Sequence, residues 1–86
     1  MRQLPSINSL ITFVTLAKVQ SVTKAANELC ISPSAVSHRI RRIETILEVK
    51  LFNNPGFELS STGARYLDAV SESLYLLDNW SEDMTA

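Results

Sequence analysis

The segment from Ser32 to Leu47 constrains the fold more than any other part of the sequence, because it predicts one helix with two opposite faces. Ser32 is a favoured N-cap residue, and Pro33 suits the first helical position, where its missing N–H is tolerated. At about 100° per residue, an arc of about 60° holds the apolar residues Val36, Ile40, Ile43 and Leu47. The far side holds the polar residues Ser34, His38, Arg41 and Thr45. We therefore expect one face to pack in a core and the other to stay open to a ligand.

Two shorter helices are expected before this one. Ser6 is a good N-cap, and apolar residues recur at helical spacing over residues 7–18. The buried face expected there consists of Ile7, Leu10, Ile11, Val14 and Ala17, widened by Phe13 and Leu16. Ser21 or Thr23 caps a second helix that ends near Leu29. Its narrow apolar stripe is Val22, Ala25, Ala26 and Leu29, and the paired alanines allow another helix to come close.

Beyond Leu47 the pattern predicts a small β-hairpin and then a long helix. Apolar residues alternate on both sides of Asn53–Gly56, and Pro55 followed by Gly56 fits the centre of a type II turn. Ser60 or Ser61 then caps a helix of about 20 residues. Its apolar stripe comprises Ala64, Leu67, Val70, Leu74 and Leu77, with Trp80 close by. The stripe either folds back on the domain or pairs with a partner helix, and its length favours dimerisation through Leu67, Val70, Leu74 and Leu77.

These elements predict a mostly α fold of one domain length. Residues 1–60 are expected to form a winged helix-turn-helix, with three helices and a small β-hairpin wing, and residues 61–86 a linker and dimerisation helix. The lone Cys30 lies in the turn between the second and third helices and is expected to be a small buried core thiol.

The charges are divided unequally between the two halves of the chain. The formal net charge of −1 argues at first against a nucleic-acid partner. However, residues 1–43 hold six lysines and arginines and one acidic residue, whereas residues 44–86 hold two basic and eight acidic residues. A polyanion would therefore meet the first half.

The open face of the 33–47 helix suits double-stranded DNA. In a helix-turn-helix the second helix lies in the major groove, with its N-terminal residues at the base edges. The short side chains of Ser34 and Ser37 allow a close approach, and His38 and Arg41 are long enough to reach base edges. The side chains expected at phosphates, from the flanks of this helix and from the helix before it, are Ser21, Thr23, Lys24, Arg39 and Arg42.

Other roles for these side chains stay open. The arginines could form a solvated face with Glu44 and Glu48 as helical partners, and the serines and threonine cap helices whether or not DNA is bound. His38 could be a surface residue or a metal ligand, but the sequence offers no partner ligands at the spacing that a metal needs.

Several classes of function find no support in the sequence. One histidine and two glycines supply neither a catalytic triad nor a phosphate-binding glycine loop, so neither an enzyme nor a cofactor is expected. There is no signal-peptide pattern, no apolar run of membrane-spanning length and no evident small-molecule effector site. A cytoplasmic protein is expected.

The motifs also resemble those of a known family. They are Leu10-x-x-Phe13, Ser21-Val22-Thr23-Lys24-Ala25-Ala26-x-x-Leu29, Ser32-Pro33-Ser34-Ala35-Val36-Ser37-His38-Arg39-Ile40-x-x-Ile43-Glu44, Leu51-Phe52 and Leu59-Ser60-x-x-Gly63. In one register over nearly the whole chain, they resemble the N-terminal signature of LysR-type transcription regulators.

The resemblance implies which residues meet DNA. It places Pro33, Ser34, Ser37 and His38 at the bases, and Ser21 and Thr23 near backbone phosphates. It also implies that the last helix pairs antiparallel with its copy in a second subunit, so that two recognition helices face successive major grooves. In this family a larger small-molecule-sensing domain follows.

The sequence departs from the family pattern at four places. Glu48 stands where glycine usually follows the recognition helix, so that helix is expected to end in a different geometry or to continue for a residue. Asn54 stands where arginine is usual, and the wing is about two residues short and has no arginine, which puts its DNA contact in doubt. Pro33 replaces a frequent glutamine, and Ser60 a threonine.

A protein-interaction module is the alternative function. Such a module would lack strong DNA binding and form mixed dimers with a longer relative through its acidic last helix. The net charge and the wing without arginine favour it.

Overall fold

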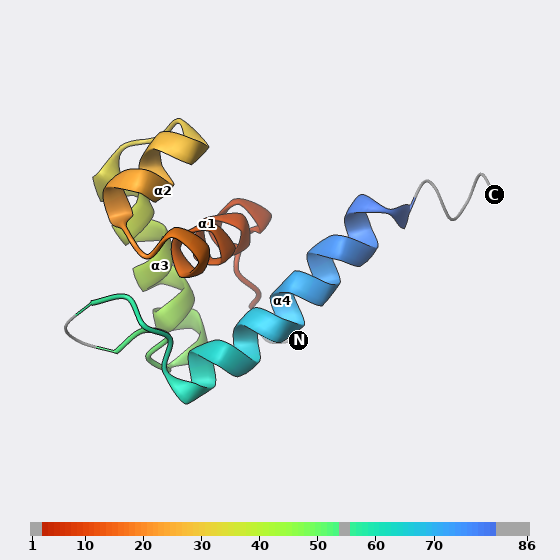
Figure 1. The fold of residues 1–86 in the computed structure, drawn as a ribbon. Coiled ribbons are helices and arrows are strands. Elements are labelled where there is room, and N and C mark those ends of the chain that lie inside the picture. The colour runs from red at the N-terminus through yellow and green to blue at the C-terminus, as the bar shows by residue number, and fades with distance from the viewer. Residues whose placement is uncertain (1–2, 54–55, 81–86) are drawn as a thin grey trace.

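The computed structural model describes residues 3–53 and 56–80, and these residues form four helices (Figure 1). The helices are α1 (Ile7–Val19), α2 (Val22–Leu29), α3 (Pro33–Leu47) and α4 (Ser61–Asp78). Helices α1, α2 and α3 pack on one another and form the three-helix body, while α4 contacts α1 and then extends away from that body (Figure 1). The mostly helical class predicted from the sequence is confirmed, with all four helices near their expected bounds.

Serine residues set the start of every one of these helices. The hydroxyl oxygens of Ser6, Ser21, Ser32 and Ser60 accept hydrogen bonds from the backbone N–H three residues later, at 2.9–3.2 Å. Such caps satisfy backbone donors that have no partner inside the helix. The predicted N-caps are therefore confirmed, with Ser21 rather than Thr23 capping α2 and Ser60 rather than Ser61 capping α4.

Three helices end at a residue in the left-handed conformation. Gln20, Cys30 and Glu48 have φ values of 54°, 57° and 57° and close α1, α2 and α3. Glycine adopts this conformation most easily. The expectation that α3 would end in a different geometry or continue for a residue was wrong, because α3 ends at Leu47 and Glu48 has the left-handed backbone conformation that glycine favours.

The core lies where the three-helix body meets the segment after α3. Its largest fully buried side chains include Phe13, Leu16, Val36, Ile43 and Leu51. The Phe13 ring lies 5.7 Å, centroid to centroid, from both Phe52 and Tyr66, and burial raises the pKa of the Tyr66 phenol. The apolar face predicted for the 33–47 helix is confirmed, since Val36, Ile40 and Ile43 are buried and Leu47 packs at the edge of the core.

The predicted buried face of α1 is confirmed at Phe13 and Leu16 and wrong at Ile7 and Ile11. The side chains buried there are Ser9, Thr12, Phe13 and Leu16, whereas Ile7 and Ile11 are exposed. Apolar residues lie on almost every side of this helix, so its periodicity did not single out one face. The large Phe13 ring fills the space against α3 and α4, which turns the isoleucines outward.

The expectation that Cys30 is buried was wrong, and the apolar stripe of α4 is covered by its own chain only in part. Cys30 is exposed, because it occupies the C-cap of α2 while the next residue, Ile31, packs against the core. In α4, Ala64 is exposed, whereas Tyr66 and Leu67 pack on the core and Val70 is buried.

The segment between α3 and α4 folds back on itself. Phe52 and Leu59 form an isolated antiparallel bridge, and the backbone N–H of Asn53 donates to the carbonyl of Glu58 at 2.8 Å. This pairing has the position and direction expected for the wing. The predicted type II turn depends on Asn54 and Pro55, which lie outside the described residues.

Gly63 allows α4 to begin directly against the segment after α3. A Cβ at this position would overlap the backbone carbonyl of Leu51. The same carbonyl accepts a hydrogen bond of 3.0 Å from the Ser60 N–H, and the Ser60 hydroxyl donates to the carbonyl of Lys50 at 2.7 Å. These contacts fix the direction in which α4 leaves the body. None of the helices in the described part of the chain has the length and hydropathy that crossing a membrane requires.

Candidate nucleic-acid interface

The exposed side of α3 presents most of the residues predicted to meet DNA bases. Pro33, Ser34, His38 and Arg41 are exposed, and Ser37 is half-buried. The buried side of the same helix holds Val36 and Ile43, both fully covered. The helix therefore has the two opposite faces predicted from its sequence.

The start of α3 is ordered by its own serines. The Ser32 hydroxyl accepts from the Ala35 N–H and lies 3.2 Å from the Ser34 hydroxyl. Ser34 is therefore both exposed and held near the helix N-terminus, where the backbone dipole favours negative charge. This arrangement suits a close approach to DNA.

The beginning of α2 adjoins the same face. A shallow depression of about 250 Å³ is lined by Leu16, Val22, Ser37, Ile40, Arg41 and Phe57. It brings the first residue of α2 together with Ser37 and Arg41 of α3. Thr23 and Lys24 are exposed at this end of α2, and half-buried Ser21 caps it. Four of the five residues predicted at phosphates therefore lie on α3 or at the neighbouring end of α2. Arg42 is exposed on α3, and Ser21, Thr23 and Lys24 lie at the start of α2.

Arg39 has a second role that the sequence did not indicate. Its Nη1 donates to the Oγ1 of Thr12 on α1 at 3.2 Å, and its side chain is half-buried. An arginine has five N–H donors, so this contact leaves others free. Arg39 therefore joins α3 to α1, and its predicted phosphate contact would be made from that fixed position.

Glu44 is a structural residue that sequence reasoning missed. Its Oε2 accepts a hydrogen bond of 2.8 Å from the backbone N–H of Leu51, seven residues along the chain. The sequence offered Glu44 as a partner for neighbouring arginines on the helix. The structure instead gives this carboxylate a partner beyond the end of α3, which helps to hold the chain that leads into α4.

Gln3 is the other residue that the sequence did not single out. Together with His38, Arg41, Arg42, Thr45 and Ile46 it lines a depression of about 400 Å³ on α3, which we call the arm groove. Gln3 precedes the first helix and belongs to no periodic pattern. Only the folded chain brings it to the α3 face.

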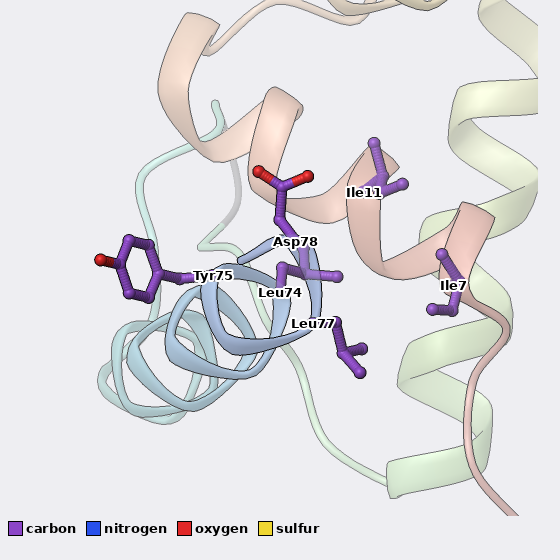
Figure 2. Close-up of a pocket in the computed structure, with 6 residues that line it drawn as sticks. All are labelled: Ile7, Ile11, Leu74, Tyr75, Leu77 and Asp78. Carbon is purple, nitrogen blue, oxygen red and sulfur yellow. The ribbon is translucent and has the colours of Figure 1, made fainter. Parts of the chain in front are cut away.

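The far half of α4 forms a second surface with α1. Ile7, Ile11, Leu74, Tyr75, Leu77 and Asp78 line a depression of about 480 Å³, which we call the distal groove (Figure 2). Leu74 points from α4 toward α1, Leu77 lies on the same side of α4, and Tyr75 points away (Figure 2). Leu77 is 62% exposed and Leu74 is half-buried, whereas Val70 is already buried within its own chain and Leu67 packs on its core.

The described residues contain no cluster of three or more histidine, cysteine, aspartate or glutamate side chains placed to hold a metal ion. His38 lies instead among arginine and threonine residues in the arm groove.

Comparison with known proteins identifies the family. Residues 7–64 match the family model for bacterial regulatory helix-turn-helix proteins of the lysR family. The chain is 39% identical over 83 residues to a glycine cleavage system transcriptional activator homolog of Haemophilus influenzae, covering 94% of this chain and 28% of that protein. It is 40% identical over 74 residues to the HTH-type transcriptional regulator DsdC of Escherichia coli, covering 84% of this chain and 24% of the regulator. The chain thus spans about a quarter of the length of these relatives.

Solved structures have the same fold. The BenM DBD in complex with catB site 1 DNA has a TM-score of 0.83 and 25% identity, and the match covers 93% of this chain and 91% of that one. A mutant of Corynebacterium glutamicum OxyR has a TM-score of 0.87 at 24% identity, and the match covers all of this chain and 28% of that one. With the matched helix-turn-helix and these relatives taken together, the chain belongs to the lysR family of bacterial regulatory helix-turn-helix proteins.

Proposed function

We propose that this chain binds double-stranded DNA in a sequence-specific manner, as a homodimer, and thereby regulates transcription. The observation that carries the proposal is the α3 helix, which is anchored by buried Val36 and Ile43 and presents Ser34, His38 and Arg41 to solvent. A helix of this kind fits the major groove of B-DNA. The relatives named as transcriptional regulators, and the DNA complex of the BenM DBD, support the same conclusion.

The base contacts and the phosphate contacts come from different residues in this proposal. Base edges are contacted by Pro33, Ser34, Ser37, His38 and Arg41, with Arg41 the side chain best suited to a bidentate bond with guanine. Backbone phosphates are contacted by Ser21, Thr23, Lys24, Arg39 and Arg42. The uneven charge distribution supports this division, because the basic residues gather in the first half of the chain.

A second copy of the chain is the proposed occupant of the distal groove. Residues 1–60 would carry DNA binding, and residues 61–86, which include α4, would carry dimerisation, with the first turns of α4 also closing the core of its own protomer. Leu77 is exposed at the end of an apolar stripe that continues beyond the three-helix body, beside exposed Ile7 and Ile11. Burying this surface against another apolar helix would be favourable. Since Val70 is already covered, the proposal depends mainly on Leu74 and Leu77.

A titration of labelled genomic DNA fragments at two salt concentrations tests this function. We expect binding that weakens steeply as salt rises, because bound lysines and arginines release counterions from the DNA. A dimer without salt-dependent binding at low ionic strength would instead favour a protein-interaction module that pairs with a longer relative. The proposed function requires neither catalysis nor a cofactor, and it places the protein in the cytoplasm with the bacterial DNA.

A further inference from the structure

The N-terminal arm, residues 3–5, runs between α4 and the exposed face of α3. Pro5 is buried, and with Leu4 it lines a depression shared with Tyr66, Val70 and other residues of α1 and α4. Two residues earlier, Gln3 is exposed and lines the arm groove on α3. The arm is therefore held at one end by packing and ends beside the residues proposed to meet DNA.

The chemistry of the arm favours a fixed course. Proline limits its own φ angle, and it also restricts the preceding residue to extended conformations. Leu4 lies directly before Pro5, so both residues lose conformational freedom before any ligand binds. Gln3 is thus presented from a short, restricted segment, which lowers the entropy lost when its side chain makes a contact.

The position of Gln3 beside α3 indicates which part of the DNA its side chain would contact. Gln3 shares the arm groove with His38 and Arg41, and also with Arg42, Thr45 and Ile46, which follow Arg41, the last α3 residue proposed at a base edge. In helix-turn-helix domains the N-terminal residues of the recognition helix contact base edges, and in homeodomains the C-terminal end contacts the backbone. An uncharged amide beside Arg42 is therefore suited to donate a hydrogen bond to a phosphate oxygen.

We propose that Gln3 is a DNA-binding residue that donates its side-chain N–H to a backbone phosphate at the edge of the major groove occupied by α3. This inference rests on the proposed DNA-binding function and adds to it a contact from outside the helix-turn-helix. The contact is independent of base sequence, and because glutamine is uncharged, it releases no counterion.

Gln3→Ala and Gln3→Lys test the proposal through the salt dependence of binding. We expect Gln3→Ala to weaken binding about three- to tenfold on every duplex, with no change in the slope of log K against log salt, as for one lost neutral hydrogen bond. Gln3→Lys should restore or exceed the original affinity and steepen the slope by about 0.9, because a lysine at a phosphate releases one counterion. Glu72→Gln is a charge-matched control, since it adds the same unit of positive charge at an exposed position of α4.

The outcomes separate the inference from the function on which it rests. If the unaltered chain binds no DNA, the proposed function itself fails. If the unaltered chain binds and Gln3→Ala binds equally well, or Gln3→Lys changes the slope no more than Glu72→Gln does, Gln3 is not at a phosphate. Circular dichroism melting of each variant checks that the fold is retained.

Discussion

Arg39 on α3 donates a hydrogen bond of 3.2 Å from Nη1 to the Oγ1 of Thr12, which is fully buried in α1. The Thr12 hydroxyl in turn donates to the carbonyl of Asn8 at 2.7 Å. A residue expected only at a phosphate is thus also part of the packing between the recognition helix and α1. The contact therefore helps to hold α3, with its exposed residues, against α1.

Thr12→Val should lower the free energy of unfolding by about 1–3 kcal/mol. The change removes the hydroxyl that accepts the hydrogen bond from the charged Arg39 side chain, while it keeps the side-chain volume. Thr15→Val is the matched control, since the Thr15 hydroxyl bonds only to the Ile11 carbonyl within α1. Urea unfolding of both variants gives the comparison. Equal stabilities for the two would mean that the Arg39 contact contributes nothing.

Arg41→Ala and Arg42→Ala should affect DNA binding in different ways. Loss of a bidentate contact to guanine at Arg41 should cost about 1–3 kcal/mol and relax specificity at one base pair. Loss of a phosphate contact at Arg42 should weaken all sequences alike and reduce the salt slope by about 1. Binding measured on a panel of single-base variants distinguishes them, and identical profiles would contradict this division of roles.

Gly63→Ala should destabilise the fold by roughly 1–3 kcal/mol, because the added Cβ would overlap the Leu51 carbonyl. The backbone of Leu51 cannot move away without breaking its hydrogen bond from the Ser60 N–H. Ser61→Ala, at an exposed position of the same helical turn, is the control. Thermal unfolding at the same midpoint for both variants would rule out a close backbone contact at Gly63.

Glu48→Gly should stabilise the fold by about 1 kcal/mol, because glycine takes the left-handed conformation without a Cβ penalty. Glu48 has a φ of 57° and an exposed side chain, so little packing is lost. Denaturant unfolding measures the change. A loss of stability would show that the glutamate makes a favourable interaction that outweighs its backbone strain.

Leu77→Lys should shift the chain from dimer to monomer, because it places a charge on the apolar surface proposed to meet a second copy. Leu76→Lys makes the same chemical change one residue away, at a side chain that is 56% exposed and outside the distal groove. Sedimentation equilibrium should therefore find Leu76→Lys as dimeric as the unaltered chain. Two equally monomeric variants would argue against a specific contact at Leu77.

Local signals in the sequence were sufficient to locate the helices. Serine N-caps and the Pro33 start gave the bounds of α3, and its periodicity identified Val36, Ile40 and Ile43 as buried. Caps and periodicity act over one or two helical turns, so they can be recognised without the rest of the fold.

Contacts between distant segments could not be predicted in the same way. The Arg39 bond to Thr12 spans 27 residues, and the Glu44 bond to Leu51 depends on how the chain turns after α3. Ile7 and Ile11 were wrongly assigned to the buried face of α1 because apolar residues surround that helix, and only packing against its neighbours selects Phe13 and Leu16 over the isoleucines. Gln3 reaches the interface through the packing of Pro5, a tertiary contact that no pattern in the sequence marks.

Methylation interference at guanine N7 tests the central claim most directly, because this atom lies in the major groove that α3 is proposed to enter. On a bound genomic fragment, we expect methylation to block binding in two patches about one helical turn, or a multiple of it, apart, as a dimer with two recognition helices requires. In the Arg41→Ala variant, interference at one guanine of each patch should disappear. Binding that is insensitive to guanine methylation throughout a site containing guanines would contradict the claim that α3 contacts the major groove.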